Sequence, residues 1–168
     1  FFAVAIALAF KNRPVVGVVH APALGETFVA VEGQGALRQR GGESETLRVS
    51  ATSELADALI ATGFSYNRNE PGCDDNSGRL ARVLPLCRDL RRLGSAELDL
   101  CYTAAGVYDA YWELYLQPYD VAAGAIIVQE AGGTVTDLSA GDDWLYGGQV
   151  LATNGRLHEA LRQQVGSA

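Results

Sequence analysis

Short apolar runs separated by turns fill the first part of the chain, up to about residue 37. The runs are rich in Val and Ala, a pattern that favours antiparallel strands. We expect strands over 1–10, 15–21 and 26–31, the first two joined as a hairpin through 11–14, and a short strand ending at Leu37. Residues 38–52 are polar and predict a loop, with 47–50 as a candidate edge strand.

From residue 59 onward, strand-like runs alternate with helix-like segments, which predicts a layered α/β fold. Pro85 should shorten or kink the second half of the first expected helix. Gly33 and Gly35 look like a nucleotide-binding loop, but no helix and no third glycine follow, so we interpret them as a turn. The expected strands cover 59–62, 90–93, 109–113, 134–136 and 149–153, and the expected helices cover 77–87, 96–105, about 120–131 and 154–165.

The segment from Asp120 to Gly132 and Gly133 is apolar on nearly every side of the expected helix, so we expect the helix to be buried between layers. Asp120, at or beside its N-cap, has a structural interpretation, because an Asp cap stabilises a helix by roughly 1 kcal/mol. A functional interpretation is also open. Glu113 ends the preceding strand, and a strand's carboxyl end and the next helix's N-terminus face the crevice where open α/β sheets bind ligands.

Composition narrows the choice of function. The chain has 168 residues, 48% of them apolar and 20% charged, which suits one domain with a core. A net charge of −7 and the lack of a basic block argue against nucleic acid as a partner. An acidic chain that handles phosphate needs cations to reverse the local field. Paired Asp74 and Asp75 could bind such a cation or cap the following helix.

The cysteines and the apolar run at residues 1–10 indicate the cellular compartment of the protein. Three cysteines without a C-x-x-C spacing and only two histidines do not suit a zinc site, and reduced thiols indicate a cytoplasmic protein. The apolar run 1–10 is about half the length of a membrane span and has no basic residues before it, so we expect a buried strand and no membrane partner. Its abrupt start suggests that an upstream portion is absent.

Five spaced blocks of sequence agree, in order and separation, with the C-terminal half of one enzyme family. These blocks are Gly94-Ser95-Ala96-Glu97-Leu98-Asp99-Leu100-Cys101, Ala104-Ala105-Gly106, Asp109-Ala110-Tyr111-Trp112-Glu113, Tyr119-Asp120-Val121-Ala122-Ala123-Gly124 and Glu130-Ala131-Gly132-Gly133. The chain therefore resembles the inositol monophosphatase family. Tyr119 departs from the usual Trp but keeps an aromatic wall.

The resemblance implies a fold and an activity. The fold would be a layered α-β-α-β-α sandwich of the sugar-phosphatase type. Residues 1–50 would form antiparallel strands of the first sheet and residues 51–168 the second α/β layer, together the C-terminal portion of one catalytic unit. The activity would be Mg²⁺-dependent hydrolysis of a small-molecule phosphate monoester of a polyol, first of all inositol monophosphate, by an enzyme that is a homodimer at full length.

The resemblance also implies site residues. Asp120 would be catalytic as a Mg²⁺ ligand, and Glu113 would accept hydrogen bonds from substrate hydroxyls. Backbone amides of Gly94, Ser95 and Ala96 would bind the substrate at a helix N-terminus. An ordinary N-cap role is equally open for Ser95.

Two metal-binding segments of the family, Gly-Glu-Glu and Asp-Pro-x-Asp-Gly-Thr, are absent from this sequence, and the second is expected just before Phe1. We therefore predict that the 168-residue chain alone does not hydrolyse phosphate esters. Two alternatives stay open: the same fold acting on histidinol phosphate, fructose bisphosphate or a nucleotide 3′-phosphate, and a non-catalytic binding or assembly module.

Overall fold

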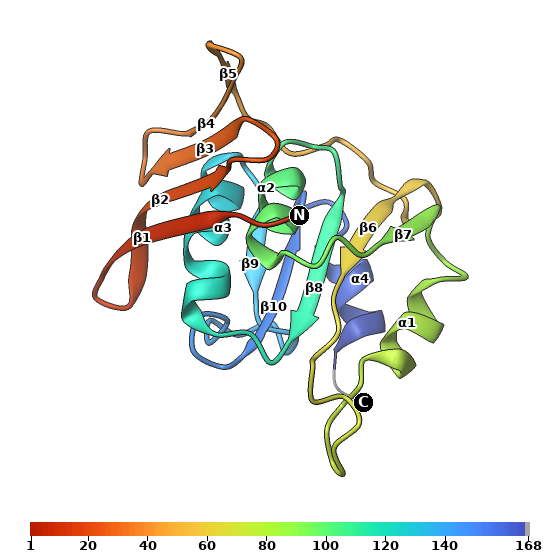
Figure 1. The fold of residues 1–168 in the computed structure, drawn as a ribbon. Helices are drawn as coiled ribbons and strands as arrows, with labels where there is room; N and C mark the ends of the chain where they lie inside the picture. The colour runs from red at the N-terminus through yellow and green to blue at the C-terminus, as the bar shows by residue number, and fades with distance from the viewer. Residues whose placement is uncertain (167–168) are drawn as a thin grey trace.

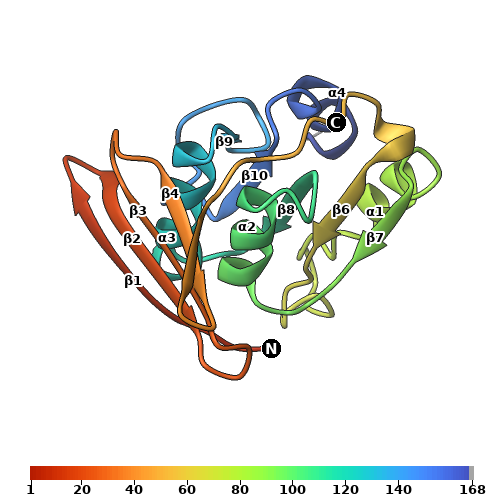
Figure 2. The ribbon, with the colours of Figure 1, turned by 90° about the horizontal axis from the view of Figure 1, so that it is seen from above.

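The computed structural model describes residues 1–166, which form two five-stranded sheets and their helices in four layers (Figures 1 and 2). In the first sheet the strands follow chain order and all pairs are antiparallel. Its strands are β1 (Val4–Phe10), β2 (Arg13–Ala21), β3 (Glu26–Val31), β4 (Ala36–Arg40) and β5 (Glu43–Thr46).

The second sheet is mixed and has the order β7-β6-β8-β10-β9. Strand β6 runs parallel to β7 and β8, whereas β10 runs antiparallel to β8 and β9. Its strands are β6 (Leu59–Thr62), β7 (Asp89–Arg91), β8 (Ala110–Leu114), β9 (Thr134–Thr136) and β10 (Gln149–Thr153). A short 3₁₀ turn, η1 (Leu55–Asp57), leads into β6.

Two pairs of helices complete the layers. Helices α2 (Ala96–Ala104) and α3 (Pro118–Glu130) lie between the sheets, and α1 (Ser77–Val83) and α4 (His158–Val165) cover the other face of the second sheet (Figure 2). One apolar core surrounds α2 and α3, and a second lies under α1 and α4. No helix within residues 1–166 is both long and apolar enough to cross a membrane.

Helix α3 is the central buried element, as its sequence predicts: every residue from Val121 to Val128 is buried. Its start differs from the prediction, because Gln117 is the N-cap and Pro118 the first helical residue, which puts Asp120 in the third position. Proline suits the first turn because its missing N–H has no helical partner there. The helix ends before Gly132, which has φ +89°.

The expectation that 1–10 forms a buried strand is wrong. Strand β1 lies at the edge of the first sheet, and its larger side chains are exposed. Val4, Ile6, Leu8 and Phe10 are between 56% and 67% exposed. The alternate positions are alanines, of which Ala5 packs against the core.

Strand β5 and most of β4 lie where the sequence predicted a loop. Residues 47–50, the candidate edge strand, form no strand. The two strands pair across a turn at Gly41 and Gly42, both of which have positive φ. An ion pair between Arg38 and Glu45 crosses this hairpin. Because the hairpin is polar on both faces, its sequence lacks the alternation that marks a strand with one buried face.

The other boundaries shift by a few residues. Helix α1 ends at Val83, before Pro85, so proline shortens the helix rather than kinking it. Asn154 does not begin α4 directly. Its side chain accepts hydrogen bonds from the amides of Arg156 and Leu157, in a turn that precedes the helix.

Candidate functional site

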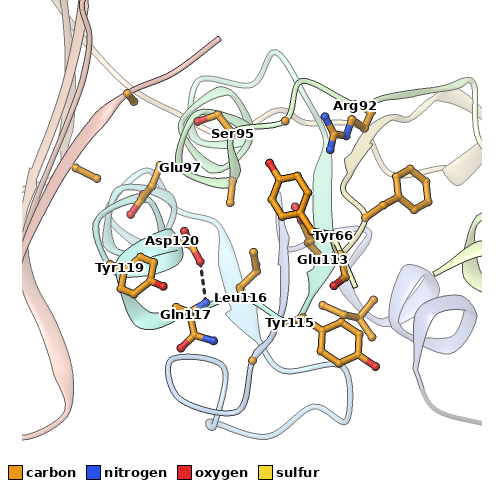
Figure 3. Close-up of a pocket in the computed structure, with 18 of the residues that line it drawn as sticks. Tyr66, Arg92, Ser95, Glu97, Glu113, Tyr115, Leu116, Gln117, Tyr119 and Asp120 are labelled. Atoms are coloured by element: carbon orange, nitrogen blue, oxygen red, sulfur yellow. Dashed lines mark hydrogen bonds between the residues drawn. The ribbon is translucent and has the colours of Figure 1, made fainter. Parts of the chain in front are cut away.

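A cavity of about 950 Å³ opens where the carboxyl end of β8 meets the N-termini of α2 and α3. It gathers every residue that the sequence singled out as a site residue: Gly94, Ser95, Ala96, Glu113 and Asp120. Figure 3 shows Asp120 and Glu97 on the two helices, with Glu113 and Arg92 across the cavity from them. The residues that the sequence singled out therefore share one cavity, although the sequence could not give the contacts of each side chain.

The two carboxylate oxygens of Asp120 have different environments, which bear on the structural and the functional interpretation of this residue. Its Oδ2 atom accepts a hydrogen bond of 2.8 Å from the amide of Gln117, which closes the first turn of α3 (Figure 3). Its Oδ1 atom has no hydrogen-bond partner within residues 1–166, and the half-buried side chain lines the cavity. One oxygen thus stabilises the helix and the other is free for a ligand.

Glu113 stands on β8 on the same face as Tyr111, because alternate residues of a strand share a face. Its Oε2 atom accepts a hydrogen bond of 2.5 Å from the Tyr111 hydroxyl. Burial raises the pKa of Glu113, while the hydrogen bond from Tyr111 and the charge of Arg92 oppose this rise and the charge of Asp120 adds to it. No hydrogen bond to Oε1 is formed by the residues that the structure describes, so this oxygen is free for a ligand.

The N-terminus of α2 offers amides to the cavity. Ser95 is the N-cap by position, but its hydroxyl makes no capping bond. In the described part of the chain, no acceptor binds the amides of Gly94, Ser95 or Ala96. Free amides at the positive end of a helix favour an anion. Gly94 has φ +87°, and the Arg92 guanidinium lies against it, 2.5 Å from where a Cβ atom would stand.

Two buried acids of α2 were quoted within the sequence blocks without a role. Glu97 and Asp99 are 6% and 1% exposed, and each has one buried oxygen, Oε1 and Oδ1, without a hydrogen-bond partner among the described residues. Burial raises the pKa of Glu97 to about 7 and that of Asp99 to about 8. The sequence signal was weak, because acids near a helix N-terminus usually serve the helix dipole at the surface.

The cavity is acidic: Glu97, Glu113 and Asp120 line it, with Arg92 as its basic residue. A cation fits this charge balance, and a phosphate needs one. Mg²⁺ is commonly held by one or two carboxylates together with waters and substrate phosphate oxygens, so the free Oδ1 of Asp120 fits as one ligand. Within residues 1–166, no cluster of three or more His, Cys, Asp or Glu residues forms a complete metal site.

The other candidates for binding have structural partners. Asp74 accepts a hydrogen bond from the Asn76 amide and forms an ion pair with Arg79, and Asp75 accepts bonds from the amide and hydroxyl of Ser77. Both acids therefore stabilise the turn before α1, but neither is the N-cap that the capping interpretation expected, because Asn76 holds that position. Gly33 and Gly35 form a turn whose amides bind the Glu130 carboxylate, each at 2.8 Å.

Comparison with known proteins gives a consistent result. The profile of the inositol monophosphatase family matches residues 1–168. Inositol monophosphatase 2 of Solanum lycopersicum is 42% identical over 162 residues, which cover 96% of this chain and 60% of that protein. Nus factor SuhB of Pseudomonas aeruginosa is 42% identical over 161 residues, which cover 95% of this chain and 58% of that protein.

Solved structures agree in fold. The structure of inositol monophosphatase from Anabaena superposes with a TM-score of 0.91 at 40% identity, covering 98% of this chain and 63% of that one. SaIMPase-II bound to inositol monophosphate superposes with a TM-score of 0.81 at 26% identity, covering 97% of this chain and 61% of that one. The chain thus spans about 60% of the length of the curated relatives it matches.

Proposed function

Because this chain belongs to the inositol monophosphatase family, we propose that it is the C-terminal portion of a Mg²⁺-dependent phosphatase that hydrolyses a phosphate monoester of a small polyol, first of all inositol monophosphate. One observation carries the proposal. Asp120 and Glu113 each keep one carboxylate oxygen free toward a cavity that also receives the N-terminus of α2.

Each part of the site has a distinct task in this proposal. The amides of Gly94, Ser95 and Ala96 bind the substrate through anionic or polar oxygens, helped by the α2 dipole. Glu113 accepts a hydrogen bond from a polyol hydroxyl through Oε1. Asp120 would hold a Mg²⁺ ion through Oδ1, and the ion, when bound, would supply activation of water and stabilisation of the leaving oxygen. The remaining metal ligands would come from outside this chain's 168 residues.

A second substrate class has an observation in its favour. A structure of SaIMPase-II is titled as bound to 2′AMP, and it superposes on this chain with a TM-score of 0.81 at 26% identity. In the present chain the aromatic residues Tyr66, Tyr115 and Tyr119 line the cavity and are 90%, 49% and 75% exposed. Such rings can stack on a base, so a nucleotide monophosphate is the second candidate.

A non-catalytic role is the third candidate, because several relatives carry the name Nus factor SuhB. It predicts retention of the fold without turnover, whereas the first two candidates both require turnover.

The test uses a protein that carries this chain at the length of its relatives, called the full-length protein below. Phosphate release is measured with inositol monophosphate, histidinol phosphate, fructose bisphosphate, 2′-AMP and 3′-AMP, with Mg²⁺ and with EDTA. We expect Mg²⁺-dependent release, with the highest kcat/KM for inositol monophosphate. A higher value for a nucleotide would select the second candidate, and no release from any ester would contradict the phosphatase proposal.

A further inference from the structure

Glu113 lies against a glycine of the neighbouring strand's end. Gly63 directly follows β6, which pairs with β8 through Thr62 and Trp112. A Cβ atom at Gly63 would stand 2.0 Å from Oε2 and 2.3 Å from Oε1 of Glu113. The carboxylate therefore occupies the space that any larger residue at position 63 would fill.

A buried hydroxyl fixes one oxygen of the same carboxylate. Tyr111 is fully buried, and its hydroxyl donates the hydrogen bond of 2.5 Å to Glu113 Oε2. A carboxylate that receives one strong bond from a rigid ring loses much of its rotational freedom. Its second oxygen, Oε1, is then held in one orientation at the cavity that Glu113 lines.

Gly63 is itself held in place by a buried polar network. The Asn76 side chain, 2% exposed, donates to the Gly63 carbonyl at 2.8 Å and to Thr62 Oγ1 at 3.0 Å. Its Oδ1 accepts a bond of 2.9 Å from the Trp112 indole. Thr62 Oγ1 in turn donates to the Trp112 carbonyl at 2.8 Å. The network locks the end of β6 against β8 directly beside Glu113.

We propose that Tyr111 and Gly63 are positioning residues for Glu113. Tyr111 binds one carboxylate oxygen and Gly63 leaves room for the carboxylate, so that Oε1 alone accepts a hydrogen bond from a substrate hydroxyl. Asn76 maintains the arrangement by fixing Gly63. This inference rests on the proposed function, because it concerns the part of that site that binds substrate hydroxyls. It predicts that substitutions of Tyr111 and Gly63 raise the KM only for substrates that carry such a hydroxyl.

The test compares two substitutions in the full-length protein, Tyr111→Phe and Gly63→Ala. Tyr111→Phe removes the hydroxyl and keeps the buried ring. Gly63→Ala adds one methyl group whose nearest neighbour is the end of the Glu113 side chain, so Glu113 can move without a backbone shift. Matched controls are Tyr108→Phe, whose hydroxyl makes no hydrogen bond within the described residues, and Gly78→Ala, in α1, where a Cβ atom would meet the Arg82 guanidinium at an ordinary contact distance of 3.8 Å.

Each variant is assayed with inositol monophosphate and with p-nitrophenyl phosphate, which has no ring hydroxyls. We expect both test substitutions to raise the KM for inositol monophosphate roughly tenfold, with kcat and the p-nitrophenyl phosphate kinetics nearly unchanged, because a charged hydrogen bond is weakened. The controls should leave both substrates unaffected. An equal loss on both substrates, or no loss on either, would overturn the proposal.

Two further measurements separate this inference from the proposed function. If Glu113→Gln leaves the preference for inositol monophosphate unchanged, the hydroxyl-reading role of Glu113 is wrong, and the positioning proposal falls with it. If the full-length protein hydrolyses neither ester, the proposed function fails, and crystal structures of the two variants test the positioning alone. A Glu113 carboxylate displaced in both variants supports positioning by Tyr111 and Gly63, whereas an unmoved carboxylate contradicts it.

Discussion

Glu97 is one of two acids of α2, with Asp99, whose environment is costly for a charge. Its Oε2 accepts the amide hydrogen bond of Gly124, but its buried Oε1 has no partner within the described chain. Burial raises its pKa to about 7, the bonds from the amides of Gly124 and Ala123 oppose the rise, and the charge of Asp120 adds to it. The folded protein therefore holds this proton at pH values where the unfolded chain has lost it.

The difference between the pKa of Glu97 in the folded and in the unfolded chain determines how the free energy of unfolding changes with pH. The folded-state pKa lies above the ordinary glutamate value of 4.5, so the group's stabilising contribution is complete below about pH 4.5 and is lost as the pH rises through about 7. Glu97→Gln removes the ionisation. At pH 8 we expect it to raise the free energy of unfolding by about 3 kcal/mol relative to the parent chain, and at pH 5 by much less.

Urea denaturation at the two pH values in EDTA measures this, with the exposed Glu43→Gln on β5 as the control. The same change at pH 5 and pH 8 would show that Glu97 is not protonated in the folded chain.

At the residue scale, the sequence predicted which positions share the cavity but not the state of each oxygen. Asp120 and Glu113 were identified from their places beside one helix and one strand. The free Oδ1 of Asp120 and the bond from Tyr111 to Glu113 depend on neighbours that only the folded chain brings together. Burial of Glu97 was equally invisible, because acids in the first turn of a helix, such as Glu97 and Asp99, usually serve the helix dipole at the surface.

Among the elements, α3 and β2 make a close contact at Gly17. A Cβ atom at Gly17 would stand 2.6 Å from the carbonyl oxygen of Ala123 and 2.6 Å from Cγ2 of Ile126. The carbonyl belongs to a buried helix and cannot move alone, so a larger residue must separate the first sheet from α3. This contact fixes the helix whose N-terminus carries Asp120.

We predict that Gly17→Ala lowers the free energy of unfolding by roughly 1–3 kcal/mol, the usual cost of overpacking a core. Chemical denaturation of the variant measures the loss. Gly78→Ala, in an exposed turn of α1, is the matched control and should be neutral or slightly stabilising. If Gly17→Ala were as stable as this control, the close packing of β2 on α3 would be refuted.

The elements that the sequence predicted well are those with one buried face or a clear stop. Strands β3, β6, β9 and β10 have the predicted bounds, and α1 ends where Pro85 forbids continuation. The polar hairpin of β4 and β5 was missed because its strands are held by cross-strand pairs rather than by burial. The exposure of β1 was also missed, since an apolar run does not reveal whether a strand is central or at an edge.

At the scale of the whole molecule, two features match the length difference from the relatives. The larger side chains of β1 form an exposed apolar row, and the described residues place the Asp120 carboxylate at the cavity but form no complete metal site. The relatives are longer, since the chain spans about 60% of them. The proposed function therefore requires the full-length protein, and we predict no turnover for the isolated chain.

The most direct test of this account is phosphate release from inositol monophosphate, measured for the full-length protein, its Asp120→Asn variant and the isolated 168-residue chain. The control Asp142→Asn changes an exposed acid outside the cavity. We predict Mg²⁺-dependent release by the full-length protein and the control, a fall of about 100-fold or more in Asp120→Asn, since a metal-ligand oxygen is lost, and none from the isolated chain. Undiminished release by Asp120→Asn would contradict the account.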